Sequence, residues 1–229
     1  RGGIYYIIAC ILKTGHDYMD DWSHPGEVKV AKLPADLTAY GDQKFIEFEV
    51  LKTGLLKNHG YCRGRDTKGD YSIVASADGV YQFCPPDVGG GQWSVTKMID
   101  EPTSDAALVD FDEDGQLEII TITPFHGDRI KVYKLINNKY MEVFVYEEPA
   151  EFAHAIWAGT VYGKPAAIIG HRKGKRDLLG ITYENGYHVN VLDSDVGSAN
   201  ILRYESEGVE YLASANREIN EIAFYEIER

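Results

Sequence analysis

Nine residues near the middle of the chain carry the clearest chemistry in the sequence. They run from Asp110 to Glu118, with further aspartates at Asp112 and Asp114 and a glycine at position 115. Carboxylates at alternate positions, then a glycine and one more carboxylate, can surround one hard cation with oxygen ligands. We therefore expect Asp110, Asp112, Asp114 and Glu118 to bind a structural Ca²⁺ ion. A plain polar turn is the alternative for the same residues.

The neighbouring sequence favours strands on both sides of this loop. An EF-hand loop opens in the same way, but its last ligand lies farther along the chain and a helix follows it. Here the short apolar segment 106–109 precedes the loop, and the β-branched segment 119–122 follows it. Strand, acidic loop, strand is therefore the predicted local structure.

Histidines form the second group of residues with catalytic or metal-binding potential. The chain has seven of them. Imidazoles gathered with carboxylates and arginines make either a metal site or a site of general acid–base catalysis. Whether the histidines gather depends on the elements that carry them, and an internal repeat predicts those elements.

Four segments of the chain align with one another at a spacing of roughly 45 residues, each with three short apolar strands. Their first strands are predicted at residues 58–64, 104–110, 153–159 and 198–204. A further β-rich stretch, such as 140–146, follows each of the earlier copies and would be a fourth, outer strand. This length and strand number are typical of the blades of a β-propeller.

The predicted fold is thus all-β, a single β-propeller domain over residues 1–229 with four-stranded antiparallel blades. The blades are expected at residues 1–51, 52–101, 102–147, 148–196 and 197–229. The first would lack its first strand and the last its fourth. Because native proteins avoid open sheet edges, we expect further strands upstream of Arg1 that complete five blades or, with a longer segment, seven.

A propeller would bring most of the histidines to one face. The first strand of each blade lines the central channel, and the loops entering it open on the same face as the loops between the second and third strands. His59 and His154 lie at the starts of first strands, and His126 and His171 lie in loops after second strands. Six of the seven histidines fall on this face by the same reasoning, and His188 lies in an outer strand.

The predicted site on that face combines imidazoles with polar neighbours. Its catalytic candidates are His59, His126, His154 and His171. Its substrate-binding candidates are Arg172 and Arg217, which suit an anion or a carboxylate, and Asn216 and Asp78, which occupy the corresponding loops of other repeats. One loop histidine is usually a hydrogen-bonded surface group, but their concentration favours a functional pocket. A transition metal such as Zn²⁺ is the cofactor expected at the imidazoles.

Short motifs resemble known propeller repeats. The acidic loop between two strands resembles the FG-GAP and VCBS-type repeats of β-propellers, such as those of integrin α-chains, although the loop has decayed in the other copies. Residues 59–83, and the motifs at 154–157 and 170–172, are similar to repeats of propeller lyases of the aldos-2-ulose dehydratase type. The likeness spans most of residues 55–229, and the chain looks closest to bacterial VCBS-repeat proteins.

The resemblance implies a carbon–oxygen lyase that acts on a sugar, because enzymes of that type eliminate water from keto-sugars and carry metal ions. His59 or His154 would abstract a proton next to a carbonyl, and a metal or Arg172 and Arg217 would stabilise the enolate oxyanion. The alternative is a calcium-stabilised propeller that binds a glycan or a protein on the same face without catalysis. A purely structural scaffold would leave the histidines without a role.

Composition limits the partners. The chain has 36 acidic and 23 basic residues and a net charge of −13, and its densest basic run, 172–176, lies in one loop. Nucleic acid is therefore a poor partner, and a sugar or glycan is the expected one. Without a run of about 18 apolar residues, no membrane-spanning helix is expected. The sequence leaves the oligomeric state open.

Cysteine usage favours a reducing compartment. Cys10, Cys62 and Cys84 are an odd number and match no zinc-binding spacing, so we interpret Cys10 and Cys62 as small hydrophobic residues of strands. Such sparse usage predicts a cytoplasmic protein, although an upstream segment would be the place for a secretion signal.

Overall fold

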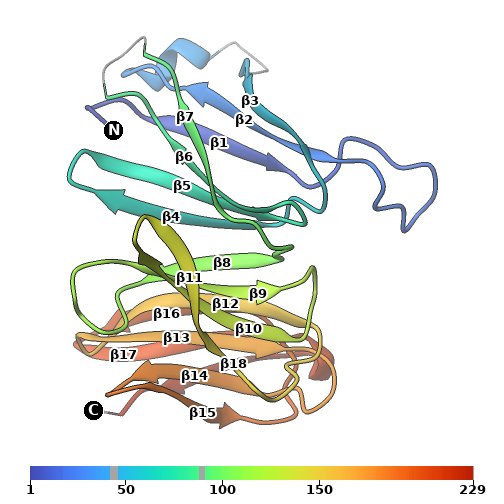
Figure 1. Ribbon diagram of the computed structural model, residues 1–229, viewed down its shortest axis with the longest axis vertical. Coiled ribbons are helices and arrows are strands. Elements are labelled where there is room, and N and C mark those ends of the chain that lie inside the picture. Colours follow the sequence, from blue (N-terminus) through green and yellow to red (C-terminus); the bar gives the residue numbers. More distant parts are fainter. Residues whose placement is uncertain (42–45, 88–90, 229) are drawn as a thin grey trace. The chain divides into compact units, whose positions relative to one another are not determined.

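The computed structural model describes residues 1–41, 46–87 and 91–228 (Figure 1). The predicted all-β class is confirmed, because the described residues form eighteen strands and only two short 3₁₀ helices. The strands form five separate antiparallel sheets of three, four, four, four and three strands, in which each strand pairs with its neighbours in sequence. The chain divides into two compact units, residues 1–103 and 104–229, and each is described by itself.

Unit 1 holds the first two sheets. Its three-stranded sheet consists of β1 (Tyr6–Ile11), β2 (Gly26–Lys32) and β3 (Glu49–Leu55), with the helix η1 (Leu37–Tyr40) between the last two. Its four-stranded sheet consists of β4 (Gly60–Asp66), β5 (Gly69–Ser76), β6 (Gly79–Cys84) and β7 (Ser94–Ile99). The first sheet extends past the predicted boundary at residue 51, because Gly26 still pairs with Leu55.

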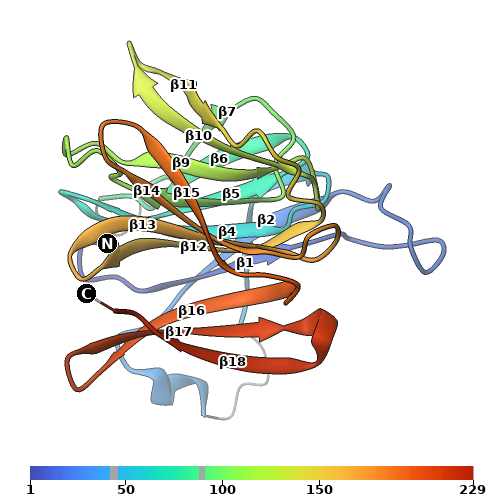
Figure 2. The same cartoon turned by 90° about the horizontal axis from the view of Figure 1, so that it is seen from below.

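Unit 2 holds the other three sheets. The first consists of β8 (Asp105–Val109), β9 (Glu118–Thr123), β10 (Arg129–Ile136) and β11 (Lys139–Val145). The second consists of β12 (Ala153–Val161), β13 (Lys164–His171), β14 (Leu178–Tyr183) and β15 (Tyr187–Asp193). The third consists of β16 (Ser198–Ser206), β17 (Val209–Asn216) and β18 (Glu221–Glu226), with the helix η2 (Arg217–Ile219), and is drawn in orange to red in Figure 2.

Packing in unit 2 buries both faces of its middle sheet. Side chains alternate between the two faces of a strand, and in β13 Ala167 and Ile169 pack with the sheet of β8–β11 while Ile168 packs with the sheet of β16–β18. Strand β12 contacts both β8 and β16. The first strands of the three sheets are thus neighbours, and the loops next to them can share a site.

Unit 1 has a core of its own. Val28 and Leu55 of the three-stranded sheet pack with Val74, Tyr81 and Phe83 of the four-stranded sheet. Neither of the described helices is long and apolar enough to cross a membrane. The cysteines of β1 and β4 lie half-buried in their strands, and none of the three cysteines forms a disulfide within the described residues.

Candidate functional site

The acidic loop connects β8 to β9, as the sequence predicted. Asp110, Asp112 and Glu118 each turn one carboxylate oxygen toward the others, and these oxygens lie within 4.8 Å of one another. Two backbone bonds shape the loop: Gly115 N donates to Asp110 Oδ2 at 3.0 Å, and Phe111 N donates to Glu118 Oε2 at 2.7 Å. Gly115 has a φ of +87°, which a glycine adopts without steric strain.

Phe111 and Glu118 fix the loop to the body of unit 2. The Phe111 side chain is only 2% exposed, packs in the core and meets the Tyr187 ring edge to face at 5.3 Å. Glu118 opens β9 and is fully buried. Burial raises the pKa of Glu118, although bonds from Phe111 N–H and Lys134 act in the opposite direction. A buried carboxylate at this point calls for a cation beside it.

Lys134 of β10 supplies a positive charge to the loop, which the sequence analysis did not foresee. Its Nζ lies 2.5 Å from Asp112 Oδ2, 2.7 Å from Asp114 Oδ2 and 3.1 Å from Glu118 Oε1. Burial opposes the charge on Lys134, but the hydrogen bonds to these carboxylates outweigh it and raise the pKa above the usual lysine value. The only sequence signal was an amphipathic third strand with a lysine in it, a feature common on protein surfaces.

The residues present fit a hard cation. All the candidate ligand atoms are carboxylate oxygens, the type that Ca²⁺ prefers. Among the residues that the structure describes, Asp110 Oδ1 and Asp112 Oδ1 are buried and receive no hydrogen bond. Three of the four predicted ligands therefore converge, whereas Asp114 is turned toward Gln116 N, at 2.9 Å, and Lys134.

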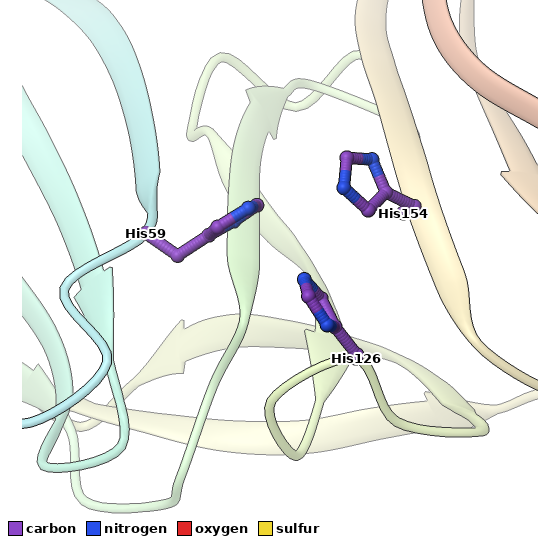
Figure 3. Close-up of side chains that lie close together, drawn as sticks. All are labelled: His59, His126 and His154. Atoms are coloured by element: carbon purple, nitrogen blue, oxygen red, sulfur yellow. The ribbon is translucent and has the colours of Figure 1, made fainter. Parts of the chain in front are cut away.

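A second candidate site in unit 2 is built around His126 and His154. Their ring centroids lie 5.2 Å apart, and one nitrogen of each lies within 4.8 Å of one nitrogen of the other. Figure 3 shows the two rings side by side, His126 on the loop after β9 and His154 on β12. His59, also drawn there, belongs to unit 1 and is described with that unit below.

A β-bulge presents His154 to the site. In the pairing of β12 with β13, Ala153 lies opposite His171 and Ala155 lies opposite Gly170, so His154 is the extra residue. Bulges re-aim a side chain out of the regular alternation of a strand. The next repeat has the same feature, with Ala199 as the extra residue of β16. The sequence alignment of the repeats had matched these two positions.

The loop that carries His126 is tied to the start of β12. Ala153 N donates to Gly127 O at 2.9 Å, and Gly127 N donates to Pro124 O at 2.9 Å, which closes a turn. His126 itself has a φ of +48°, in the left-handed region that histidine enters more readily than most residues other than glycine.

Aromatic rings and one arginine surround the pair. His126 stacks on Phe125 at 4.0 Å between centroids and lies 4.6 Å from Phe152. The guanidinium of Arg172 lies over the Phe152 ring at 4.8 Å. Arg172 Nε also donates to Glu218 Oε1 at 2.8 Å. The predicted anion-binding Arg172 is therefore already in an ion pair, whereas Arg217 is exposed.

His154 is in the neutral form near neutral pH. Its Nδ1 lies 2.9 Å from Ala199 O, and because a carbonyl only accepts, Nδ1 carries the proton and Nε2 the lone pair. Burial lowers the pKa of His154, and the charges of Arg172 and Arg217 act in the same direction, while the bond to Ala199 O opposes them. A neutral imidazole can accept a proton or bind a metal ion.

Asp105 is a titratable group that was not among the predicted site residues. It opens β8, next to β12, in the corresponding part of the preceding repeat. Burial raises its pKa from 3.8 to about 7, against the lowering effect of the bond from Ala106 N. A carboxyl group that keeps its proton near pH 7 is a candidate general acid. The sequence signal was its alignment with His154 across the repeats.

The remaining predicted residues are held by bonds within their own unit. His171 is 2% exposed; its Nδ1 donates to Lys173 O at 3.0 Å, and its Nε2 accepts from Asp177 N at 3.0 Å. Asn216 is buried and donates to Glu221 Oε1 at 2.9 Å and Tyr225 OH at 3.3 Å. Both side chains anchor loops. Their predicted parts in catalysis and substrate binding remain predictions.

In unit 1, Asp78 and His59 lie at the ends of strands. Asp78 Oδ2 accepts from Leu56 N at 2.8 Å, which ties the β5–β6 turn to the end of β3. His59 directly precedes β4, is half-buried, and its backbone N donates to Ala75 O at 3.1 Å.

Comparison with known proteins adds no family to this description. No protein-family model matches the chain, and a search of curated proteins returned no match. The resemblances to FG-GAP and VCBS repeats and to propeller lyases stay predictions, and the site has to be interpreted from its own geometry.

The bonds of His171 lead to a prediction about stability. His171→Ala leaves the buried N–H of Asp177 without its acceptor, removes one of the two donors to Lys173 O and removes a buried ring, so we expect a loss of about 2 to 4 kcal/mol in the free energy of unfolding. His188→Ala is the control, because His188 is exposed on β15, and its effect is expected within about 0.5 kcal/mol. Urea unfolding at pH 7.5 measures both. Equal values for the two variants would contradict the anchoring role.

The pKa of Asp105 leads to a prediction about pH. The folded protein keeps the Asp105 proton up to about pH 7, while the unfolded chain releases it near 3.8, so this group lowers stability as the pH rises between those values. Asp105→Asn keeps the bond from Ala106 N but carries no charge. We expect it to stabilise the fold at pH 7.5, on the order of 1 to 3 kcal/mol, and to have little effect at pH 4. Urea unfolding at the two pH values tests this, and a gain of the same size at both would refute it.

Proposed function

We propose that this protein acts on a sugar, with His126 and His154 as the acid–base pair of a lyase or dehydratase. The observation that carries the proposal is the pair of imidazoles, 5.2 Å apart between ring centroids, with His154 Nδ1 held 2.9 Å from Ala199 O so that Nε2 is the basic nitrogen. The lowered pKa of His154 keeps the base form present at neutral pH. Arg217 supplies positive charge nearby, which suits a substrate on which negative charge develops.

The reaction that fits these groups is an elimination next to a carbonyl. His154 Nε2 takes the proton from the carbon next to the carbonyl, and the electron pair of that C–H bond forms an enolate. The enolate then re-forms the carbonyl as the C–O bond on the next carbon breaks. The leaving hydroxyl takes a proton from His126 or Asp105 and departs as water. Arg217, and Arg172 if it leaves Glu218, would stabilise the enolate oxyanion.

Metal ions have two proposed places in this function. Ca²⁺ at Asp110, Asp112 and Glu118 would stabilise the β8–β9 loop. In a metal-dependent alternative to the mechanism above, His126 and His154 would supply two of the three protein ligands that a catalytic Zn²⁺ usually has, and the ion would act as a Lewis acid on the carbonyl oxygen. Another group would then have to be the base, because the ion would occupy His154 Nε2. His59 was predicted from the sequence to take part as well, and its role remains a proposal that a variant can test.

A propeller is the proposed arrangement of the repeats. It is supported by the regular succession of antiparallel sheets and, in unit 2, by the neighbouring first strands β8, β12 and β16. On that proposal His126 and His154 belong to the face on which sugar-directed propellers bind their ligands. The bacterial FG-GAP and VCBS repeats remain the proposed family.

A non-catalytic binding protein is the second candidate. Arg172 is held by Glu218 and Phe152, and His171 and Asn216 are used in internal hydrogen bonds. This leaves few groups for chemistry. The stacked rings of Phe125, His126 and Phe152 offer apolar faces of the kind on which a sugar ring or a peptide side chain packs.

The deciding experiment is a substrate screen with matched variants. Keto-sugars and uronic-acid oligosaccharides are incubated with the wild-type protein, and the conjugated carbonyl or unsaturated uronate product is followed by ultraviolet absorbance. We expect product formation, and a fall in kcat of at least about 100-fold for His154→Gln, the loss typical of removing a general base. His188→Ala should retain the wild-type rate, and His59→Gln tests the proposed role of that residue.

The two candidate functions differ in the outcome. A sugar that binds in calorimetry, binds more weakly to His154→Gln and never yields a product would identify a binding protein. Neither product nor binding across the screen would refute both proposals for this site.

The lowered pKa of His154 also predicts the pH profile of the enzyme. The base form is lost only as the pH falls through that pKa, so the acid limb of kcat/KM is expected below about 6.5, the ordinary histidine value. A limb at or above that value would contradict His154 as the base. In the His154→Gln variant the same limb should disappear.

A further inference from the structure

We infer that Lys134 is a tethered cation of the acidic loop and that Ca²⁺ binds there by displacing it. The inference rests on the proposed calcium site. It adds a competition between Ca²⁺ and the Lys134 ammonium, whose contact with the loop is visible only in the structure. Lys134 reaches the loop from β10, a different strand from the two that the loop connects.

The ammonium group and a metal ion would share two carboxylates, those of Asp112 and Glu118. Lys134 Nζ contacts Asp112 and Glu118, and both of these belong to the group of converging carboxylates. Ca²⁺ holds its ligands at about 2.3 to 2.6 Å. The Lys134 ammonium is already 2.5 and 3.1 Å from the Asp112 and Glu118 carboxylates. A calcium ion bound to the same two carboxylates would therefore lie next to another positive charge. The two cations therefore exclude each other.

Lys134 neutralises the loop but does not contact all of its carboxylate oxygens. An ammonium has three N–H donors, and here they face Asp112, Asp114 and Glu118. Within the described chain, Asp110 Oδ1 and Asp112 Oδ1 stay buried without a donor. Glu118 is fully buried, and one of its carboxylate oxygens belongs to the same group. An ion with six to eight oxygen ligands would engage the oxygens that lysine leaves over.

The lysine has a route out of the site. Its side chain is 18% exposed, and those of Asp112 and Asp114 are 25% and 37% exposed, so one side of the loop opens to solvent. The four-carbon stem of lysine is flexible and its head group is readily hydrated. In the metal-free protein Lys134 thus keeps the loop formed, and in the calcium-bound protein its head group would lie in water.

The test compares Lys134→Met with the wild type and with Lys131→Met. Lys131 is a matched control, since it lies on the same strand, is 17% exposed and is ion-paired to Glu142 at 3.0 Å. Calcium affinity is measured by calorimetry on protein stripped with a chelator, and thermal melting is followed with chelator and with CaCl₂. We expect Lys134→Met to bind Ca²⁺ at least tenfold more tightly than the wild type, to melt earlier in chelator and to recover in calcium. Lys131→Met should leave the calcium affinity unchanged.

A second measurement uses the wild-type protein and does not depend on the variant folding. Acylation of lysine amines, quantified by mass spectrometry, should increase at Lys134 when CaCl₂ is added and stay constant at Lys131. Equal calcium affinity of Lys134→Met and the wild type, with unchanged labelling, would overturn the displacement while leaving the calcium site intact. If neither protein binds Ca²⁺, the calcium proposal itself fails, and the inference fails with it.

Discussion

In the described parts of the chain each sheet has only three or four strands, and a sheet that small is stable only when neighbours cover it. In unit 2 the middle sheet meets this constraint on both faces, with Ile169 buried against one neighbour and Ile168 against the other. The continuous apolar stretch of β13, residues 166–169, follows from it, because a strand covered on both sides has no face turned to water. Chemistry is therefore confined to the strand ends and the loops beside them.

Both candidate sites of unit 2 begin at such strand ends. The acidic loop starts where β8 leaves the core, with Phe111 still packed and Glu118 already in the next strand. His154 lies at the start of β12, where a bulge interrupts the alternation that the core imposes. The sheet packing fixes where these groups lie, and the local departures from regular strand geometry decide which way they point.

The sequence predicted the strands well because apolar and β-branched segments, separated by turn residues, repeat along the chain. The acidic loop was predicted for the same local reason, since its ligands lie within nine residues. Lys134 was not, because its contact with Asp112 spans 22 positions and depends on how β10 pairs. The inward anchoring of His171 was also missed, since a loop position in a repeat does not say whether a ring turns to solvent or to the backbone of its own loop.

Asp105 shows a different limit. Its place in the repeat was visible in the alignment, but its raised pKa comes from the burial of the carboxyl group, which the linear pattern does not encode. Composition argued only against one class of partner, nucleic acid. It did not help to locate a site, because net charge does not say where a pocket lies. The proposal that the repeats together form a propeller rests on the periodicity of the sequence.

The hydrogen bond from His154 to the carbonyl of Ala199 crosses from one repeat to the next. The tautomer of the imidazole in the third repeat is thus set by the backbone of the fourth. Repeats joined in this way are not interchangeable modules: losing or shifting the last sheet would leave the sequence around His154 intact and still change which of its nitrogens carries the proton. In a chain built from repeats, one such bond between neighbours is enough to fix which repeat must follow which.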